Sequence, residues 1–523
     1  MAFLFRTFAV EAFVIPTGSM APTLRGAHLV GVGPESGYRF AVGPRDMAQG
    51  TTLALPIQGS TGAGPIEVAD PMLSTNTARQ PDEINVRFQG ARTRMGDRIL
   101  VLKYLYSFFP PRRFDVIVFK NPTDPRQNYI KRLIGLPNET VWLADGDVFV
   151  SKQDGEIGSF TIERKPEHVQ RRVWQPVYHS QYIPVHPDHI TPRWSPPWDG
   201  GPNWEIDRKR SYQCTTDQPA TLVYRNDLKP IEDRYVYNES GRGKTTFPVS
   251  DIRLTGIVQA EDDAWSSTIR LRCRQHVFEA VVSNGRAVLR MAADGHGDAA
   301  PDWQVLADEA VDINDKPGAF TPIEFWHADQ ALWLWVNDDL VAKAEYDWSA
   351  NMRLDLATGL AGSEAAALVQ RQTERSAQLH NPYSYGPAKP SQPHIEWEFA
   401  GGPLTLHRIE LDRDLFYRPD EMPRPSLTDT VYPALATHPI HLPTLNGDQF
   451  FACGDNSPNS LDGRLWGDPV PWIDFLFDDA APGVVPRELL LGKAFFVYFP
   501  SPESLSENGR RFIPNFGEMR FIH

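Results

Sequence analysis

The stretch "NYIKRLIGLPNETVWLADGDVFVS", residues 128–151, indicates a protein built mainly from β-strands. Its first part is apolar except for Lys131 and Arg132, which suits a buried strand. Its second part turns at Asp145-Gly146, a dipeptide typical of tight hairpins, so we predict strands at 141–143 and 148–150. Upstream, "GDRILVLKY" (96–104) and "RFDVIVFKNP" (113–122) are further β-rich runs bounded by turn residues.

Composition agrees with this β-rich interpretation. The chain has 523 residues, which suggests two or three domains. Its 46 prolines, 38 glycines and 14 tryptophans favour a loop-rich β protein over a helical one. The net charge of -14 argues against a nucleic-acid partner, which would require a basic face.

Two predicted strand pairs farther along the chain lie in a segment of different composition, which holds most of the tryptophans. Residues 278–292 turn at Asn284-Gly285, and residues 323–348 turn at Asn337-Asp338. Short, regular strands of this kind predict an antiparallel sandwich. We therefore expect one β-rich domain split between residues 1–160 and 426–523, with an irregular excursion at 31–90. Residues 161–425 are expected to form a large inserted β-sandwich.

Cysteine usage and hydropathy exclude several classes of site. Cys214, Cys273 and Cys453 form no CxxC pair, so no metal site is expected. A Cys214–Cys273 disulfide is an open alternative, but three unpaired cysteines are favoured. No run of about 18 apolar residues occurs, so no transmembrane helix is visible. The first 15 residues are a short apolar stub broken by Arg6 and Glu11.

A single serine stands out in "FVIPTGSMAPTL", residues 13–24. Ser19 lies in a proline-flanked turn, and a serine that attacks an amide needs a base. None of the 14 histidines falls in this stretch or around Lys131. A lysine serves as the base only when an apolar setting keeps it neutral, and the neighbours of Lys131 provide such a setting. On spacing alone, a solvated strand-edge lysine is the commoner explanation.

Five stretches taken together change that assessment. "FVIPTGSMAPTL", "GDRILVLK", "DVIVFKNP", "NYIKRLIGLPNETV" and "GDNSPNSLDGRLWG" (454–467) resemble, in order, the conserved motifs of bacterial type I signal peptidases, the Ser/Lys leader peptidases of peptidase family S26. The resemblance implies a β-rich catalytic domain and a serine endopeptidase that removes signal peptides from exported precursors. It implies no cofactor.

The resemblance also implies residue roles. Ser19 matches the nucleophile and Lys131 the general base. Thr17 and the backbone N–H of Ser19 match the oxyanion donors, and Ser460 matches the serine that orients the lysine. The implied supporting cluster is Arg132, Asp455, Asp462 and Arg464, and the implied substrate pocket is Phe13, Ile15, Met20, Leu24, Tyr129 and Ile130. Substrates would have small residues at positions −1 and −3 and would pair with the strand at 13–15.

Some features depart from the family. Its members carry a membrane anchor before the first motif, whereas this chain shows only the stub. The implied location is the outer face of the bacterial cytoplasmic membrane, with the membrane surface and the secretion machinery as partners. Gly463 stands where the family often has serine.

The middle segment leaves two other functions open. It resembles concanavalin- or laminin-G-like sandwiches, in which surface aromatics often bind glycans. Trp326, Trp333 and Trp335 are candidates for that role, although alternating tryptophans are more often packed in a core, and a structural or docking role is favoured. One alternative is therefore a glycan- or cell-wall-binding protein with a degenerate protease scaffold. Another is a Ser/Lys protease that cuts its own chain.

Overall fold

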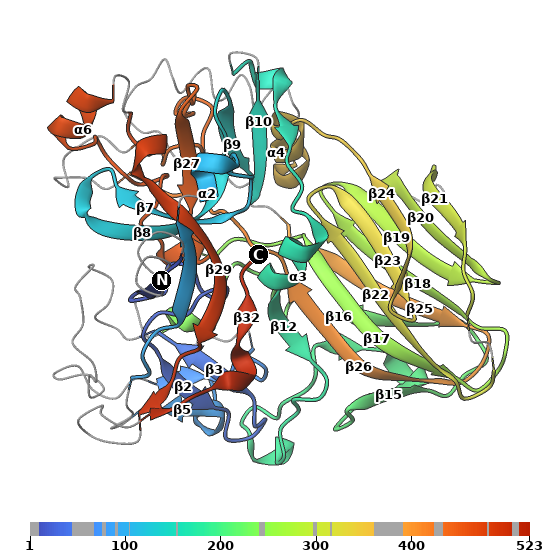
Figure 1. Ribbon diagram of the computed structural model, residues 1–523. Helices are drawn as coiled ribbons and strands as arrows, with labels where there is room; N and C mark the ends of the chain where they lie inside the picture. The colour runs from blue at the N-terminus through green and yellow to red at the C-terminus, as the bar shows by residue number, and fades with distance from the viewer. Residues whose placement is uncertain are drawn as a thin grey trace.

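The computed structural model describes most of the chain, and within that part the protein is mainly β, as predicted (Figure 1). The described residues are 10–43, 67–75, 80–88, 93–103, 105–152, 155–239, 246–295, 301–313, 316–359, 391–422, 432–477, 481–504 and 512–523. Most of the N-terminal stub and much of the expected excursion at 31–90 lie outside these ranges.

One antiparallel sheet combines strands from the two ends of the chain. It runs in the order β1-β6-β29-β7-β8-β27-β28, with β32 paired to β29. The C-terminal strand β29 lies between β6 and β7, so residues almost 400 positions apart hydrogen-bond side by side. The strands are β1 (Val10–Val14), β6 (Arg98–Lys103), β7 (Val116–Asn121), β8 (Asp124–Gly135), β27 (Gln449–Cys453), β28 (Val484–Pro486), β29 (Leu490–Phe499) and β32 (Arg520–Phe521).

Short strand pairs flank this sheet. The predicted hairpin at 141–150 is confirmed: Asp145 and Gly146 both have positive φ between its strands. The stretch expected to be irregular contains two small strand pairs in its described parts. These elements are β9 (Thr140–Ala144), β10 (Asp147–Ser151), β11 (Thr161–Ile162), β2 (Leu29–Val32), β3 (Arg39–Val42), β4 (Glu67–Ala69), β5 (Asn85–Arg87), β30 (Glu503–Ser504) and β31 (Phe512–Ile513).

Two larger sheets face each other in the middle of the chain (Figure 1). One runs β14-β15-β26-β17-β22-β23-β24, with β12 paired to β26, and the other β13-β16-β25-β18-β19-β20-β21. Alternate residues of β17 and β18 are buried, and side chains from both sheets share one apolar core. We call this unit the sandwich. Its strands are β12 (Gln175–His179), β13 (Trp198–Asp199), β14 (Trp204–Glu205), β15 (Ser211–Cys214), β16 (Ala220–Tyr224), β17 (Ile252–Ala260), β18 (Ser266–Cys273), β19 (His276–Ser283), β20 (Arg286–Ala293), β21 (Gln304–Ala310), β22 (Phe320–Ala328), β23 (Ala331–Val336), β24 (Asp339–Glu345), β25 (His394–Ala400) and β26 (Leu404–Arg413).

The helices of the described residues are short. They are α2 (Leu105–Phe108), α3 (Glu167–Val173), α4 (Ala350–Thr358) and α6 (Pro471–Leu476). None of the helices that the structure describes has the length and apolar character needed to cross a bilayer. The three cysteines are buried and unpaired, as the sequence favoured.

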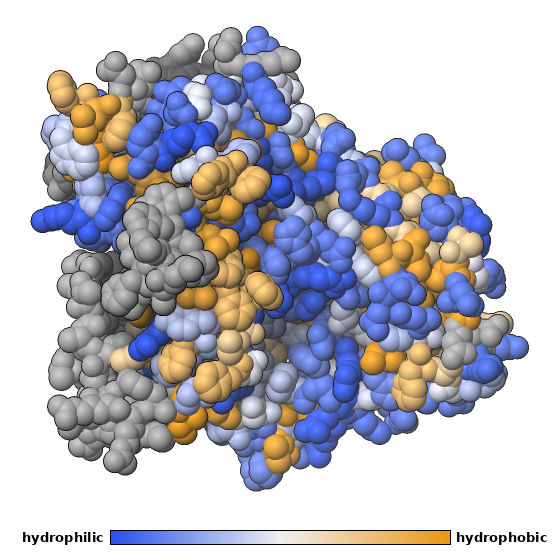
Figure 2. Space-filling model, viewed as in Figure 1, coloured by the Kyte–Doolittle hydropathy of each residue, from blue (hydrophilic) through white to orange (hydrophobic). Residues whose placement is uncertain are grey.

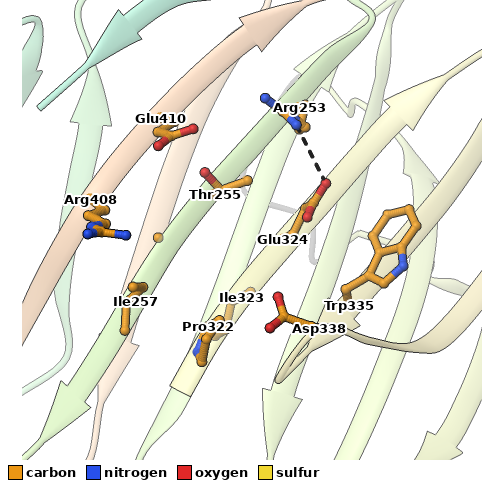
Figure 3. A pocket seen from close by; sticks show the side chains of 11 residues that line it. Arg253, Thr255, Ile257, Pro322, Ile323, Glu324, Trp335, Asp338, Arg408 and Glu410 are labelled. Atoms are coloured by element: carbon orange, nitrogen blue, oxygen red, sulfur yellow. Dashed lines mark ion pairs between the residues drawn. The ribbon is translucent and has the colours of Figure 1, made fainter. Parts of the chain in front are cut away.

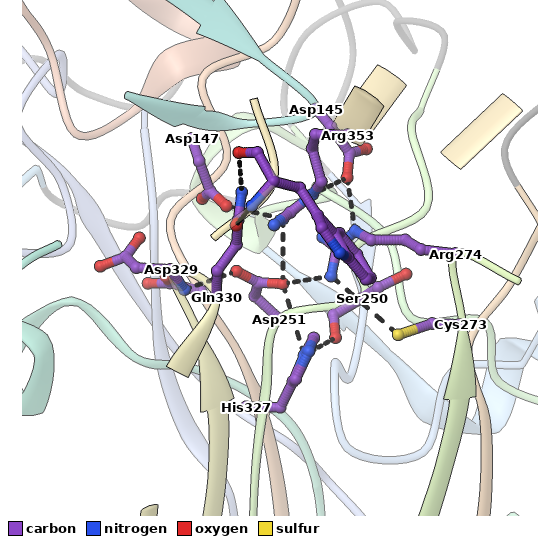
Figure 4. Close-up of polar contacts among 12 residues, drawn as sticks. Asp145, Asp147, Ser250, Asp251, Cys273, Arg274, His327, Asp329, Gln330 and Arg353 are labelled. Atoms are coloured by element: carbon purple, nitrogen blue, oxygen red, sulfur yellow. Dashed lines mark hydrogen bonds and ion pairs between the residues drawn. The ribbon is translucent and has the colours of Figure 1, made fainter. Parts of the chain in front are cut away.

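A buried network of charges joins the β9–β10 hairpin to the sandwich (Figure 4). The Arg353 guanidinium of α4 lies 2.8 Å from Asp145 and 2.6 Å from Asp147 of the hairpin, and 3.3 Å from Asp251 of the sandwich. The network consists of Asp145, Asp147, Asp251, Asp329, Asp414, Lys165, Arg274 and Arg353. Carboxylate oxygens of four of these aspartates lie within 4.8 Å of one another. Because the cationic side chains lie among them, we interpret the group as an ion-pair network.

Candidate active site

The turn after β1 carries Ser19. Ile15, just before this turn, donates its N–H to Asp97 O over 2.9 Å, and Asp97 directly precedes β6. This hydrogen bond ties the start of the turn to β6. Within the turn, Ala21 N–H donates to Gly18 O and Leu24 N–H to Met20 O. Ser19 is half-buried, whereas Met20 beside it is completely buried. The turn therefore anchors its apolar side chains and leaves the serine at the surface of the core.

Lys131 of β8 meets Ser19 across 112 positions of sequence. Its Nζ lies 2.8 Å from Ser19 Oγ and 3.1 Å from Ile130 O. The side chain of Lys131 is only 3% exposed, so the contact is shielded from bulk water. The two residues that the sequence proposed as nucleophile and base are thus within hydrogen-bond distance.

Burial also sets the protonation of Lys131. Desolvation lowers the pKa of its ammonium from 10.5 to about 8, and the negative charges of Asp462 and Asp455 oppose part of that shift. An amine with this pKa is partly neutral near pH 8, so it is able to accept a proton there.

Two buried ion pairs support the surrounding strands. Arg132, next to Lys131, points away and binds Asp455 through two hydrogen bonds of 2.8 and 2.7 Å. Arg464 binds Asp462 through two hydrogen bonds of 2.9 Å, and Asp462 accepts the N–H of Gly454. All four charged side chains are fully buried, so each pair neutralises charge that would otherwise be costly.

The groups expected to bind the oxyanion (Thr17 and the Ser19 N–H) and to orient the lysine (Ser460) make no hydrogen bond to Ser19 Oγ or Lys131 among the described residues. Within the described ranges, neither the Thr17 hydroxyl nor the backbone N–H of Ser19 donates a hydrogen bond, so both are available as donors there. Ser460 Oγ is buried and has no hydrogen-bond partner in the part of the chain that the structure describes. An added Cβ on Gly454 would lie 2.2 Å from Ser460 Oγ and 2.5 Å from Ser19 O, so Ser460 is near the turn. Its action on Lys131 stays a prediction.

The six predicted pocket residues divide by burial. Ile15, Met20 and Leu24 are at most 3% exposed and pack in an apolar cluster with Ile99 and Val101. Phe13 and Ile130 are partly buried at its border, and Tyr129 packs beside Phe119 and Trp466. The first three therefore stabilise the turn, while the contact of all six with substrate stays a prediction.

Sequence reasoning missed Asn456. Its backbone N–H donates to Ser19 O over 3.0 Å, and its Nδ2 donates to Gly18 O over 2.9 Å. The residue lies inside "GDNSPNSLDGRLWG", between two residues that were noted, and an asparagine in a loop gives no signal of its own. Tyr237 and Asn238, which also reach this site, lie in the sandwich segment and carry no motif.

A second candidate site is a pocket of about 240 Å³ on the outer face of the sandwich (Figure 3). Arg253, Glu324, Arg408 and Glu410 lie around it. Most of these groups already have partners, since Arg253 binds Asp412 and Glu410 binds His179. Trp335 at its edge is only 3% exposed.

Of the tryptophans named as glycan candidates, Trp326 and Trp335 are packed, whereas Trp333 is only partly buried. Trp326 is fully buried, with its ring centroid 4.2 Å from that of Trp335 and 5.5 Å from that of Trp174, which follows α3. The guanidinium of Arg171 lies over both Trp326 and Trp335. The rings of Trp326 and Trp335 therefore hold α3 against the sandwich.

Comparison with known proteins links part of the chain to one family. Residues 78–188 match the family described as signal peptidase, peptidase S26; this range includes Lys131 but not Ser19. A signal peptidase I of Leptolyngbya laminosa is 46% identical over 67 residues, 11% of this chain and 32% of that protein. A signal peptidase I of Pseudomonas aeruginosa is 33% identical over 105 residues, 15% of this chain and 37% of that protein. The chain thus resembles type I signal peptidases, and it spans about a third of the length of these two relatives.

Among solved structures, the carbohydrate-binding module CBM66 of Bacillus subtilis is similar, at 9% identity and a TM-score of 0.22. The match covers 41% of this chain and 95% of the module.

Proposed function

We propose that the protein is a signal peptidase I, a serine endopeptidase that removes signal peptides from exported precursors. The observation that carries this proposal is the 2.8 Å contact between Lys131 Nζ and Ser19 Oγ. The chain's likeness to signal peptidases supports it, as does the lowered pKa of the buried lysine.

In the proposed mechanism, neutral Lys131 takes the proton of Ser19 as Oγ attacks the scissile carbonyl. Thr17 and the N–H of Ser19 donate hydrogen bonds to the oxyanion, and such donors typically contribute about 3–4 kcal/mol. The C–N bond then breaks, and the Lys131 ammonium gives its proton to the leaving amine. A water molecule, activated by the same lysine, hydrolyses the ester on Ser19. Ser460 would orient the lysine amine.

The substrate strand is proposed to add beside β1. Among the residues that the structure describes, this strand is the end of its sheet and pairs on one side with β6, Phe13 opposite Ile99. An extended precursor would pair with the edge of β1 that faces away from β6, near Ser19. Small side chains at −1 and −3 would suit a site whose walls are the packed turn and β8.

Cleavage of a model precursor by the full chain tests the proposal. Ser19→Ala and Lys131→Ala are each expected to abolish cleavage, because one removes the nucleophile and the other the base. Lys131→Arg is expected to fail as well, since a guanidinium stays protonated. The exposed Lys152→Ala is the matched control and should cleave normally. Activity retained in the Ser19 or Lys131 variants would overturn the mechanism.

Association with a membrane surface is part of this proposal. Figure 2 shows apolar side chains over β29 and β32 and over α6. Exposed apolar residues in these regions are Phe516, Met519, Phe521, Trp472, Phe475 and Leu476. Exposed apolar groups of this kind mark contact sites for membranes or proteins.

The glycan-binding alternative has less support. It predicts accessible aromatic faces, whereas Trp326 and Trp335 are almost completely buried. The partly buried Trp333 stacks on Trp335, and Lys343 Nζ lies over its ring. A glycan array probed with the full chain and with Ser19→Ala tests it. Specific glycan binding together with absent cleavage by the wild type would favour the alternative.

A further inference from the structure

A segment of the sandwich lies against the nucleophile turn. It belongs to the connection between β16 and β17 and contains a short 3-10 turn, η6 (Val236–Asn238). Tyr237 is 3% exposed, its hydroxyl donates to Ala27 O over 2.9 Å, and its carbonyl accepts Gly43 N–H over 2.7 Å. A Cβ on Gly18 would lie 2.1 Å from Tyr237 Cε1. The tyrosine ring therefore packs directly against Gly18, where only a hydrogen atom fits.

The neighbouring Asn238 forms a reciprocal amide pair with Asn456. Asn238 Nδ2 donates to Asn456 Oδ1 over 2.8 Å, and Asn456 Nδ2 donates to Asn238 Oδ1 over 2.9 Å. The second hydrogen of Asn456 Nδ2 is directed to Gly18 O. The opposite orientation of the Asn456 amide would set its oxygen against Gly18 O, two acceptors with no proton between them. Gly18 O thus selects which way the Asn456 amide faces, and the two hydrogen bonds from Asn238 hold that amide in place.

Asn456 in turn fixes both peptide planes beside Ser19. The Gly18–Ser19 peptide is planar, so a hydrogen bond that holds Gly18 O also sets the opposite direction in which Ser19 N–H points. That N–H is the proposed oxyanion donor. The backbone N–H of Asn456 holds Ser19 O, which fixes the next plane. The Cα of Ser19, and with it the position of Oγ, lies between the two fixed planes.

We propose that the sandwich is a positioning element of the active site and that Asn238 is a positioning residue, acting through Asn456 on the Gly18–Ser19 peptide. The inference rests on the proposed function for its kinetic consequence. Asn238 touches neither Ser19 Oγ nor Lys131, so its loss misdirects the oxyanion donor and leaves the base in place.

Kinetics of the full chain on a model precursor test this inference. Asn238→Ala is expected to lower kcat by about 10- to 100-fold, the usual effect of a misplaced group in an active site. KM should change less than about twofold, and the midpoint of the pH–rate profile should not move because the surroundings of Lys131 are unchanged. Asn203→Ala, an exposed asparagine of the sandwich between β13 and β14, is the matched control and should behave as the wild type. An unchanged kcat in Asn238→Ala would overturn the inference.

A double-mutant cycle tests the route. If Asn238 acts through Asn456, then Asn238→Ala should have no further effect on kcat in an Asn456→Ala background. Multiplicative losses would refute action through Asn456. Asn238→Asp keeps the size of the side chain but sets a carboxylate oxygen against Asn456 Oδ1, so it should lower kcat at least as much as the alanine variant.

Hydrogen exchange supplies a readout that does not depend on activity. The peptide covering residues 13–24 should exchange faster in Asn238→Ala than in the wild type or in Asn203→Ala, because Asn456 no longer holds the turn through its pair with Asn238. If the wild type fails to cleave any precursor while this difference in exchange appears, the proposed function is wrong, but Asn238 does stabilise the turn through Asn456. If cleavage occurs while exchange and kcat are unchanged, the positioning role is wrong and the proposed function stands.

Discussion

At the scale of single residues, the protonation of Lys131 decides the pH dependence of the proposed reaction. Because its pKa is lowered to about 8 and the neutral amine is the active form, kcat/KM should rise with pH, with a midpoint near 8. Below the midpoint the slope should approach tenfold per pH unit. The measurement is precursor cleavage from pH 5 to pH 10, with circular dichroism at each pH to exclude unfolding. A midpoint near 6 or below would identify a different base.

The residues of this site differ in how well the sequence predicts them. Ser19 and Lys131 lie in stretches that resemble signal-peptidase motifs, so this resemblance, rather than their spacing, predicts their pairing, and they lie 2.8 Å apart. Asn456 makes only backbone-directed contacts to the nucleophile turn, and no spacing rule announces these. Asn238 depends on a contact across 218 positions, between segments with no shared pattern. Such contacts arise from the packing of whole units, which local sequence does not encode.

At the scale of elements, α6 provides a test of membrane association. Pro471 opens the helix and Ile473 is its buried anchor, whereas Trp472 and Phe475 are 51% and 85% exposed. Aromatic side chains of this kind insert into the interface of a bilayer. Replacing both with serine should lower the fraction of protein bound to anionic phospholipid vesicles about tenfold or more, measured by co-sedimentation.

The control for α6 is Phe320→Ser, which removes a similarly exposed aromatic ring from the sandwich. It should bind vesicles as the wild type does. Equal binding by the α6 variant and the wild type would show that another surface contacts lipid.

Hairpins were the elements that the sequence predicted best. Asp145-Gly146, Asn284-Gly285 and Asn337-Asp338 all adopt positive φ between paired strands, because these residue types tolerate that conformation. The prediction of a single strand pair over residues 323–348 was wrong, because a further turn at Asp329-Gln330 divides this stretch into three strands. The order of strands in the sheets was not predictable in the same way. The position of β29 between β6 and β7 depends on a pairing that no local turn dictates.

At the scale of the whole molecule, the buried charge network couples the sandwich to the β9–β10 hairpin. Its five aspartates face three cations, and the nearby His327 is kept neutral because burial lowers its pKa to about 3. Desolvation, helped by the charge of Asp251, raises the pKa of Asp147 well above its ordinary value. Desolvation likewise raises the pKa of Asp414 to about 6. At pH values between its unfolded and its raised pKa, each of these carboxyls therefore holds a proton that it would lose in the unfolded chain.

This excess of bound protons fixes the sign of a stability change with pH. A raised carboxyl pKa contributes stability below the unfolded value, near 4, and that contribution is lost as pH rises toward the folded pKa.

Asp147→Asn keeps an acceptor for Arg353 and removes the titration. The melting temperature of Asp147→Asn should therefore rise relative to that of the wild type as pH increases from 5 to 8. The difference between their free energies of unfolding should change by up to about 1.4 kcal/mol per pH unit. Thermal unfolding at several pH values measures this, with the exposed Asp217→Asn as control. A difference between Asp147→Asn and the wild type that stays constant with pH would mean that Asp147 is ionised throughout, and that three cations suffice to balance the network.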